Sequence, residues 1–373
     1  MPFSGKNLSR HLSNIPGWRT SRKIVVIESD DWGSIRMPSL AAFDRLKAAG
    51  LSLDKGDALR YNRNDTLAGA DDFHALFEVL QRHQDRHGNP AVLTALSLSA
   101  NPDFDRIRDA GFTQYHYEPI TQTLERYYPG QHVFNYWQEG IRKKLFVPQF
   151  HGREHLNVAS WMKALSDHEE QTLAAFSEGC WGFSNRHPYN VRYQAAFDVT
   201  DPAEIDTHHK ILKEGLDLFE KLHGYRARFF VPPNGPINNA VEKTAAENGI
   251  QFMSASKVQH EALGLGKTRR RLHYLGQRNV HGQCYITRNC FFEPSQPGSN
   301  WVERCLDEIS IAFRWRKPAI ISSHRVNYVG GLQEQNRRHG LQQLNRLLQG
   351  ILQRWPDAAF MTSDELGALM LHG

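Results

Sequence analysis

The chain has 373 residues, of which 40% are hydrophobic and 23% are charged, and its formal net charge is +5. These values describe an ordinary soluble globular protein with a large core, and the small charge argues against nucleic acid as a partner. The N-terminus lacks the apolar core of a signal peptide, and no apolar run approaches transmembrane length. We therefore expect a cytoplasmic protein without a membrane partner, and the sequence leaves its oligomeric state open.

Short apolar runs alternate with amphipathic segments along the chain. Residues 24–27 form a β-branched run without alternation, as expected for a parallel strand buried on both faces. Further strands are predicted at residues 91–98, 145–150, 227–231, 251–254, 271–275, 283–287, 319–323 and 359–362. Helical spacing is present at residues 39–49, 71–87, 158–176, 201–223, 237–248, 299–314 and 332–354. This alternation predicts an α/β protein with a parallel sheet, most simply a (β/α) barrel.

The sequence has no boundary that would divide residues 22–373 into separate domains. Residues 1–21 are polar and basic and are predicted to be a loosely packed lead-in, whereas residues 22–373 contain no linker or composition break. They are therefore predicted to form a single catalytic domain. Residues around 100–144 are rich in aromatic side chains and have no clear period, so we expect an insertion over the active face.

The cysteines give no sign of a zinc knuckle or a redox pair. Cys180, Cys284, Cys290 and Cys305 include no Cys-x-x-Cys spacing. We expect four reduced and mostly buried thiols.

Polar side chains follow several of the predicted strands. Because the carboxyl ends of parallel strands meet at one rim, these side chains are expected to converge there. They are Asp30 and Asp31, His151 and His155, Asn234, Arg288 and Asn289, and His324.

Two histidines and an aspartate in this set have the composition of a hydrolytic zinc site. His151 and His155 are spaced i, i+4, which on a helical turn places both imidazoles on one face. With Asp31 they make three protein ligands and leave one position for water. Asp30 is then free to act as the general base, and His324 is a candidate for the acid that protonates the leaving group.

These motifs resemble those of the polysaccharide deacetylase superfamily, the metal-dependent esterases that remove N- or O-acetyl groups from glycans. The first motif of that superfamily ends in Asp-Asp, as at Asp30–Asp31, and the second is His-x-x-x-His, as at His151–His155. A Pro-Pro motif is approached by residues 231–235, and a strand ending in histidine is matched by residues 320–324. The order agrees over roughly residues 22–366.

The resemblance implies a distorted (β/α) barrel with seven or eight mostly parallel strands and a bound divalent metal, most simply Zn²⁺, with Co²⁺, Mn²⁺ and Ni²⁺ as alternatives. It also implies an acetylated carbohydrate as substrate. The base would be Asp30, the acid His324, and the metal ligands Asp31, His151 and His155. The backbone N–H of Asn234 would help bind the oxyanion. Separately from the resemblance, we predict that Trp32 and Tyr328 stack on sugar rings.

The chain departs from the superfamily pattern at several positions. Val231 replaces the arginine of the Pro-Pro motif, no Asp-Trp motif is present, and Ser323 replaces the leucine before His324. Arg288 is predicted to contact substrate, or to supply the missing positive charge near the base. A long insertion separates the first two motifs and is expected to reshape the substrate cleft.

Two other interpretations remain open at this stage. Residues 151–155 also fit His-x-x-Glu-His, the inverted zinc-peptidase pattern, in which Glu154 would be the base on a long helix. A barrel that binds glycans without catalysis is the second alternative. The basic run at residues 267–271 does not complete a phosphate-binding loop and is interpreted as a solvated turn.

Overall fold

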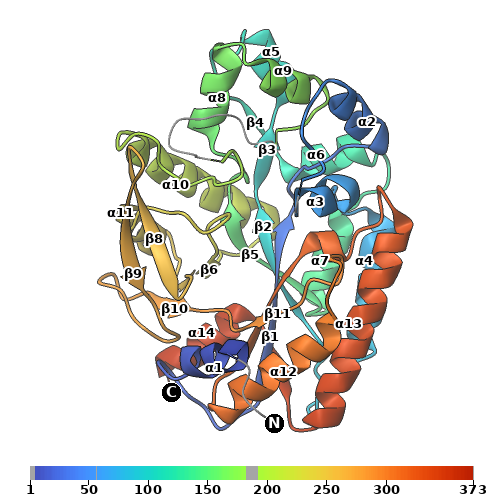
Figure 1. Ribbon diagram of the computed structural model, residues 1–373, viewed down its shortest axis with the longest axis vertical. Helices are drawn as coiled ribbons and strands as arrows, with labels where there is room; N and C mark the ends of the chain where they lie inside the picture. Colours follow the sequence, from blue (N-terminus) through green and yellow to red (C-terminus); the bar gives the residue numbers. More distant parts are fainter. Residues whose placement is uncertain (1–4, 56, 182–191, 373) are drawn as a thin grey trace.

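A curled parallel sheet forms the centre of the computed structural model, which describes residues 5–55, 57–181 and 192–372 (Figure 1). Eight strands follow the order β10-β7-β6-β5-β2-β1-β12-β11, and the ninth, β13, pairs with the first half of β1. All these pairings are parallel, so the predicted distorted (β/α) barrel is confirmed. The strands are β1 (Ile24–Trp32), β2 (Leu93–Leu98), β5 (Phe146–Gly152), β6 (Phe229–Phe230), β7 (Phe252–Ser254), β10 (Cys284–Ile286), β11 (Cys290–Phe291), β12 (Ala319–His324) and β13 (Ala359–Met361).

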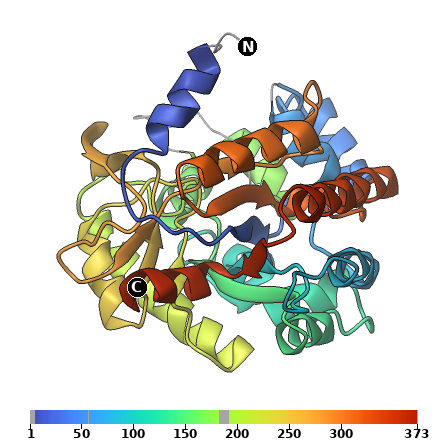
Figure 2. The same cartoon turned by 90° about the horizontal axis from the view of Figure 1, so that it is seen from below.

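The barrel is open along one side. In the described chain, β10 and β11 are the two ends of the sheet, and residues 287–289 cross the seam between them. Helix α1 lies beside this seam, where it packs against α12 (Figure 2). The Asn289 side chain donates to Asn14 Oδ1 at 3.1 Å, so the segment after α1 is fixed to the seam.

The helices surround the sheet on its outer side. The predicted helix at residues 158–176 is interrupted, because His168 adopts a left-handed backbone with φ 55° and separates α8 from α9. The helices are α1 (Gly5–Ser13), α2 (Leu40–Ala48), α3 (Ala58–Asn64), α4 (Ala70–Gln81), α5 (Phe104–Asp109), α6 (Ile120–Tyr127), α7 (Phe134–Arg142), α8 (Val158–Ser166), α9 (Glu170–Ser177), α10 (Glu204–His223), α11 (Ala240–Glu247), α12 (Trp301–Arg314), α13 (Glu334–Arg354) and α14 (Ser363–His372).

Three segments differ from their predicted form. The lead-in contains helix α1, and its Arg10 forms an ion pair with Glu308 at 2.7 Å. The strand predicted at residues 271–275 is instead part of an antiparallel hairpin outside the main sheet, formed by β8 (Val258–Gly264) and β9 (Lys267–Leu272). The basic run lies on β9, whose side chains are mostly exposed, and is a strand rather than a turn.

The aromatic-rich segment at residues 100–144 forms a small hairpin and three helices. The hairpin pairs β3 (Ala100–Pro102) with β4 (Tyr117–Pro119). Asn101 on β3 donates to Gly33 O at 2.8 Å and accepts from the Ile35 N–H at 3.0 Å. The inserted segment therefore braces the loop that follows β1, just beyond Asp30 and Asp31.

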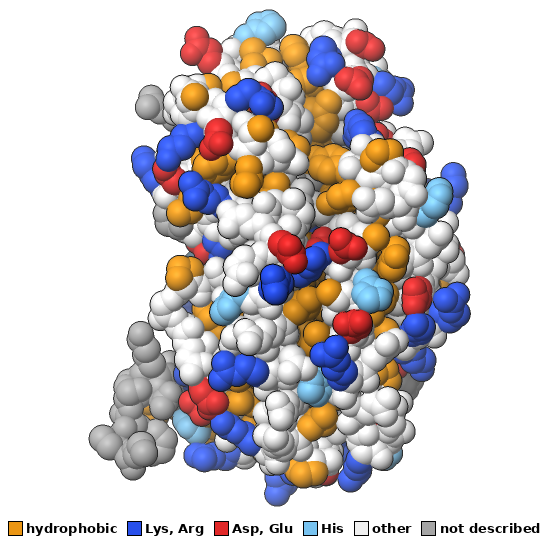
Figure 3. All heavy atoms as spheres, turned by 90° about the vertical axis from the view of Figure 1, so that its right-hand side faces the viewer, with side chains coloured by type: hydrophobic (Ala, Val, Ile, Leu, Met, Phe, Trp, Pro, Cys, Tyr) orange, Lys and Arg blue, Asp and Glu red, His pale blue; other side chains and the backbone are white. Residues whose placement is uncertain are grey.

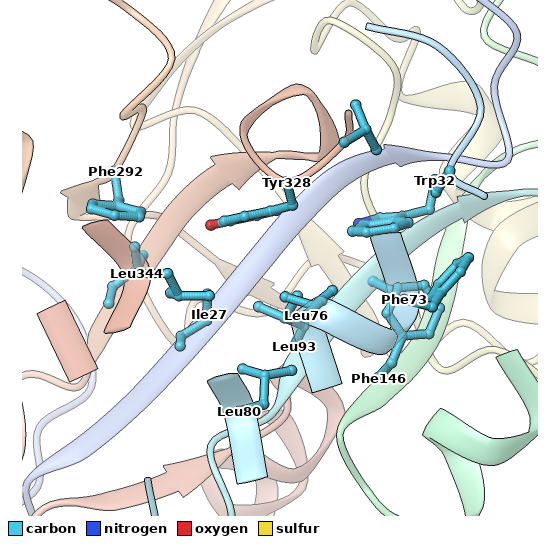
Figure 4. Close-up of a cluster of buried hydrophobic side chains, with 14 of the residues drawn as sticks. Ile27, Trp32, Phe73, Leu76, Leu80, Leu93, Phe146, Phe292, Tyr328 and Leu344 are labelled. Atoms are coloured by element: carbon cyan, nitrogen blue, oxygen red, sulfur yellow. The ribbon is translucent and has the colours of Figure 1, made fainter. Parts of the chain in front are cut away.

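The largest hydrophobic cluster lies between β1, β2, β5 and the helices α4, α7, α12 and α13. Figure 4 shows Ile27 of β1 and Phe146 of β5 against Phe73 and Leu76 of α4. All nine residues of β1 are buried, as predicted for a strand covered on both faces. The four cysteines are free and buried, as predicted. Among the described helices, none is both long and apolar enough to cross a membrane.

Candidate metal centre and catalytic cavity

The predicted strand-end residues converge on one large cavity. Asp30 and Asp31 end β1, His151 lies near the end of β5, and His324 ends β12 beside Asp30 in the strand register. With His155, these side chains line a cavity of about 1230 Å³. Sites for small ligands typically measure about 300–1,000 Å³, so this one has room for a substrate larger than a single sugar.

The three predicted metal ligands lie together. Ligand atoms of Asp31, His151 and His155 all fall within 4.8 Å of one another, and each of the three residues is buried. Asp31 Oδ1 is 3.0 Å from His155 Nε2 and 3.6 Å from His151 Nε2. This is the arrangement predicted from the sequence, built from segments more than a hundred residues apart.

The hydrogen bonds of these histidines fit a metal site. His151 Nδ1 lies 2.7 Å from the Val231 carbonyl oxygen, to which it donates, so Nε2 keeps its lone pair. Within the described ranges, His151 Nε2 and His155 Nδ1 are buried without hydrogen-bond partners. Burial lowers the pKa of His155 to about 4, so this imidazole is neutral near pH 7. A buried imidazole nitrogen that has no partner and faces a carboxylate is a donor suited to Zn²⁺, and His151 Nε2 fits this description.

Arg36 is an additional cation at this centre that the sequence analysis missed. Its Nη2 is 3.3 Å from Asp31 Oδ2, and its Nε is 3.5 Å from Asp65 Oδ2. Burial raises the pKa of Asp31, but the Arg36 charge and the neighbouring imidazoles hold it well below its usual value. Asp31 is therefore ionised, as a metal ligand must be.

Asp30, next in sequence to the candidate ligand, has a different partner. Arg288 Nη2 donates to Asp30 Oδ1 at 2.5 Å, and Nη1 donates to Asp30 Oδ2 at 2.7 Å. Arg288 also donates to Glu28 at 2.5 Å and to Ser322 at 3.0 Å. Burial raises the pKa of Asp30, and the Arg288 charge and hydrogen bonds outweigh that effect and lower it.

These contacts fit one of the two predicted roles of Arg288, because they place next to Asp30 a positive charge that Val231 cannot supply. Four hydrogen bonds to Glu28, Asp30 and Ser322 hold the guanidinium in place. Arg288 also lines the cavity, so its predicted contact with substrate remains a prediction.

His324 is held by a carboxylate that the sequence analysis also missed. His324 Nδ1 lies 2.5 Å from Glu293 Oε1, and its Nε2 is 3.8 Å from Asp30 Oδ2. Burial lowers the pKa of His324, but Glu293, followed by Asp30, raises it to about 9. Glu293 follows β11, whose two residues are too few to predict from periodicity. The imidazole is therefore protonated at neutral pH.

Three residues predicted to bind substrate have different environments. Asn234 is exposed in a turn with φ 55° and lines the cavity, so its predicted contact remains a prediction. Trp32 and Tyr328 are 1% and 0% exposed and lie in the hydrophobic cluster of Figure 4. Stacking on a sugar requires an exposed ring face, so both of these predictions are wrong.

The inverted zinc-peptidase interpretation also fails on local structure. Residues 151–152 are the end of a strand, and residues 153–155 are not helical. The i, i+4 histidines therefore meet through a strand end and a bend rather than on a helical turn. Glu154, the base in that interpretation, forms two hydrogen bonds of 2.6 Å with Arg153.

Comparisons with known proteins find similar solved structures at low sequence identity. No family model matches the chain, and no curated protein matches it. It is similar to a solved structure from Mycobacterium smegmatis provisionally described as a polysaccharide deacetylase (12% identity, 95% of this chain and 93% of that one, TM-score 0.46). It is also similar to a Pseudomonas aeruginosa PAO1 structure with a comparable provisional description (10%, 93% and 91%, 0.48) and to the allantoinase PuuE (12%, 99% and 96%, 0.48). At this identity the activity has to be inferred from the site itself.

Proposed function

We propose that this protein is a divalent-metal-dependent hydrolase that removes an acetyl group from an N-acetylated sugar, oligosaccharide or polysaccharide. One observation carries the proposal: a three-ligand centre, a clamped carboxylate and a protonated imidazole line the same cavity. A closed structural zinc site has four protein ligands, whereas three ligands leave a position open for reactants.

Asp30 is the proposed general base. A Zn²⁺, Co²⁺, Mn²⁺ or Ni²⁺ ion held by Asp31, His151 and His155 would polarise the acetyl carbonyl and acidify a water molecule. Asp30 accepts a proton from the attacking water molecule, and the oxygen of that water molecule bonds to the carbonyl carbon. The bidentate Arg288 contact supports this role, because it keeps Asp30 ionised and oriented.

His324 is the proposed general acid. When the carbon–nitrogen bond breaks, His324 donates its proton to the departing amine, and acetate and the free amine are released. Glu293 supports this role, since it raises the pKa of His324 to about 9 and fixes the ring through Nδ1. The backbone N–H of Asn234, which lines the same cavity, is proposed to help stabilise the oxyanion.

The proposal is tested by acetate release from a panel of N-acetylated sugars, comparing wild type with Asp30→Asn, each with and without a chelator. We expect turnover by the metal-loaded wild type, loss of turnover with chelator, and recovery when Zn²⁺ is added back. Chelator-resistant turnover would contradict the mechanism. Tight metal binding without hydrolysis of any acetylated sugar would favour the glycan-binding barrel instead.

A further inference from the structure

One arm of the cavity extends from the catalytic residues along the open seam to helix α1. Its wall includes Arg10 of α1, Lys257 before β8, and Arg304 and Glu308 of α12. Glu308 Oε1 is 2.7 Å from Arg10 Nη2 and 3.2 Å from Arg304 Nε. A single carboxylate, 3% exposed, thus faces two guanidinium groups and leaves one positive charge uncompensated.

Lys257 adds a second uncompensated charge to the same wall. Its ammonium donates to Ser13 O at 2.9 Å and to Ser13 Oγ at 3.1 Å. Among the residues that the structure describes, no carboxylate forms an ion pair with it.

The described lining of the whole cavity contains seven lysines and arginines and five carboxylates. Near the catalytic residues, however, Arg36 and Arg288 also pair with Asp65 and Glu28, and His324 pairs with Glu293. The excess positive charge is therefore on the arm. On the outer face seen in Figure 3, by contrast, side chains of both signs are interspersed. A half-buried ammonium without a counter-charge is costly, and a negatively charged ligand would remove that cost.

The seam connects this arm to the catalytic residues. Arg288 holds Asp30, the Asn289 side chain contacts Asn14, and the Phe291 N–H donates to Glu308 at 2.8 Å. From Arg288 to Phe291 the chain advances by three residues, at most about 11 Å, so the arm and the catalytic residues lie close enough for one ligand to reach both.

We propose that this arm binds a phosphate or carboxylate group of the substrate, so that the substrate is an anionic acetylated sugar rather than a neutral glycan. This inference rests on the proposed function, because the same molecule must present its acetyl group to Asp30 and the metal centre. Lys257 would make the principal ionic contact, with Arg10 and Arg304 at the rim.

The test compares steady-state kinetics on N-acetylglucosamine, its 6-phosphate and an N-acetylated uronic acid, using the zinc-loaded full chain. We expect a KM about tenfold lower for at least one anionic sugar than for the neutral one. One hydrogen bond to a charged group is strong enough to produce a difference of this size. Lys257→Gln should abolish that preference, while Lys257→Arg should keep it. Gln can still donate to Ser13, so the pair separates charge from packing. Lys243→Gln, which changes an exposed lysine paired with Glu247, is the matched control.

Binding of inorganic phosphate, followed by calorimetry, separates this inference from the proposed function. Phosphate binding that is about tenfold weaker in Lys257→Gln, but not in Lys243→Gln, supports the anionic subsite even if no acetylated sugar is hydrolysed. Hydrolysis of neutral and anionic sugars with equal KM, or phosphate binding that Lys257→Gln leaves unchanged, overturns it. The phosphorylated and carboxylated sugars identify which anion the arm prefers.

Discussion

Asp30 and Asp31 are neighbours in sequence, yet they belong to two regions of the site with opposite character. Asp30 lies on the acid–base side, where Arg288 satisfies both of its oxygens. Asp31 lies on the metal side, facing His151 and His155, whose buried nitrogens include two without partners among the described residues. The pKa of Asp30 is thus set by a protein partner. The imidazole nitrogens without partners are instead available to bind a ligand.

A local distortion of β1 produces this separation. The pairing of β1 with β2 shifts register between Ser29 and Trp32, and Asp31 adopts φ 76°. Left-handed backbone is unfavourable for a residue other than glycine by roughly 1–3 kcal/mol, and such strain is concentrated at functional sites. The bulge and the strained residue turn two adjacent carboxylates toward different partners.

The largest effect is expected on the metal side. Asp31→Ala removes the only carboxylate of the candidate ligand set, so bound zinc should fall to background, and turnover with it. Elemental analysis of the purified variant measures this directly. Glu154→Gln is the control, because Glu154 is paired with Arg153 outside the ligand set. Zinc retained by Asp31→Ala would contradict the assigned centre. A Glu154→Gln variant that lost its activity but kept its zinc would revive the peptidase interpretation.

A smaller loss is expected on the acid–base side. Asp30→Asn keeps the shape of the side chain but cannot accept the proton, so kcat should fall by about 10²- to 10⁴-fold. Zinc content should remain at the wild-type level, because Asp30 is not among the candidate ligands. Parallel measurement of kcat and zinc content separates the two sides. An Asp30→Asn variant that lost its zinc would show that the two aspartates share one role.

The same contrast explains how far the sequence alone could be interpreted. Asp31, His151 and His155 were predictable because each follows an apolar run in a recognisable motif and parallel strand ends meet at one rim. Glu293 and Arg36 were not, because each lies in irregular backbone and reaches the site only through tertiary packing. The same limit applies to the two-residue strands β6 and β11, whose length is below any detectable period.

The two wrong side-chain predictions have a common cause. Aromatic residues beside catalytic motifs were assigned to sugar stacking, but a motif does not specify which face of the strand a neighbour occupies. Trp32 follows the bulge and packs 4.7 Å, centroid to centroid, from Phe146, whereas Tyr328 contacts Ser323 in the core. Burial is a property of the assembled layers, so it could not be derived from local sequence.

A third prediction concerns the pH dependence of the acid. Glu293 raises the pKa of His324 to about 9, so the protonated imidazole persists below that pH and activity should decline above it. Glu293→Gln removes the negative charge, so the pKa of His324 should fall toward 6.5, the usual value of a histidine, and the alkaline limb of kcat should move to lower pH. At pH 8 the variant should be several-fold slower than wild type, and the difference should narrow at pH 6. A limb that stays in place would exclude His324 as the acid, and Glu303→Gln on α12 serves as the control for a lost surface charge.

The smallest effect is expected for a residue that belongs to neither side. Tyr328 shares a 2.7 Å hydrogen bond with Ser323 Oγ, which in turn donates to Phe292 O at 2.8 Å. Tyr328→Phe keeps the ring in the core and removes one internal hydrogen bond, so the free energy of unfolding should fall by about 1 kcal/mol. Because the ring has no exposed face, kcat and KM for an acetylated sugar should not change. Urea denaturation and steady-state kinetics on the same preparation check both expectations. A raised KM with unchanged stability would instead place Tyr328 in contact with substrate, next to the histidine that ends β12.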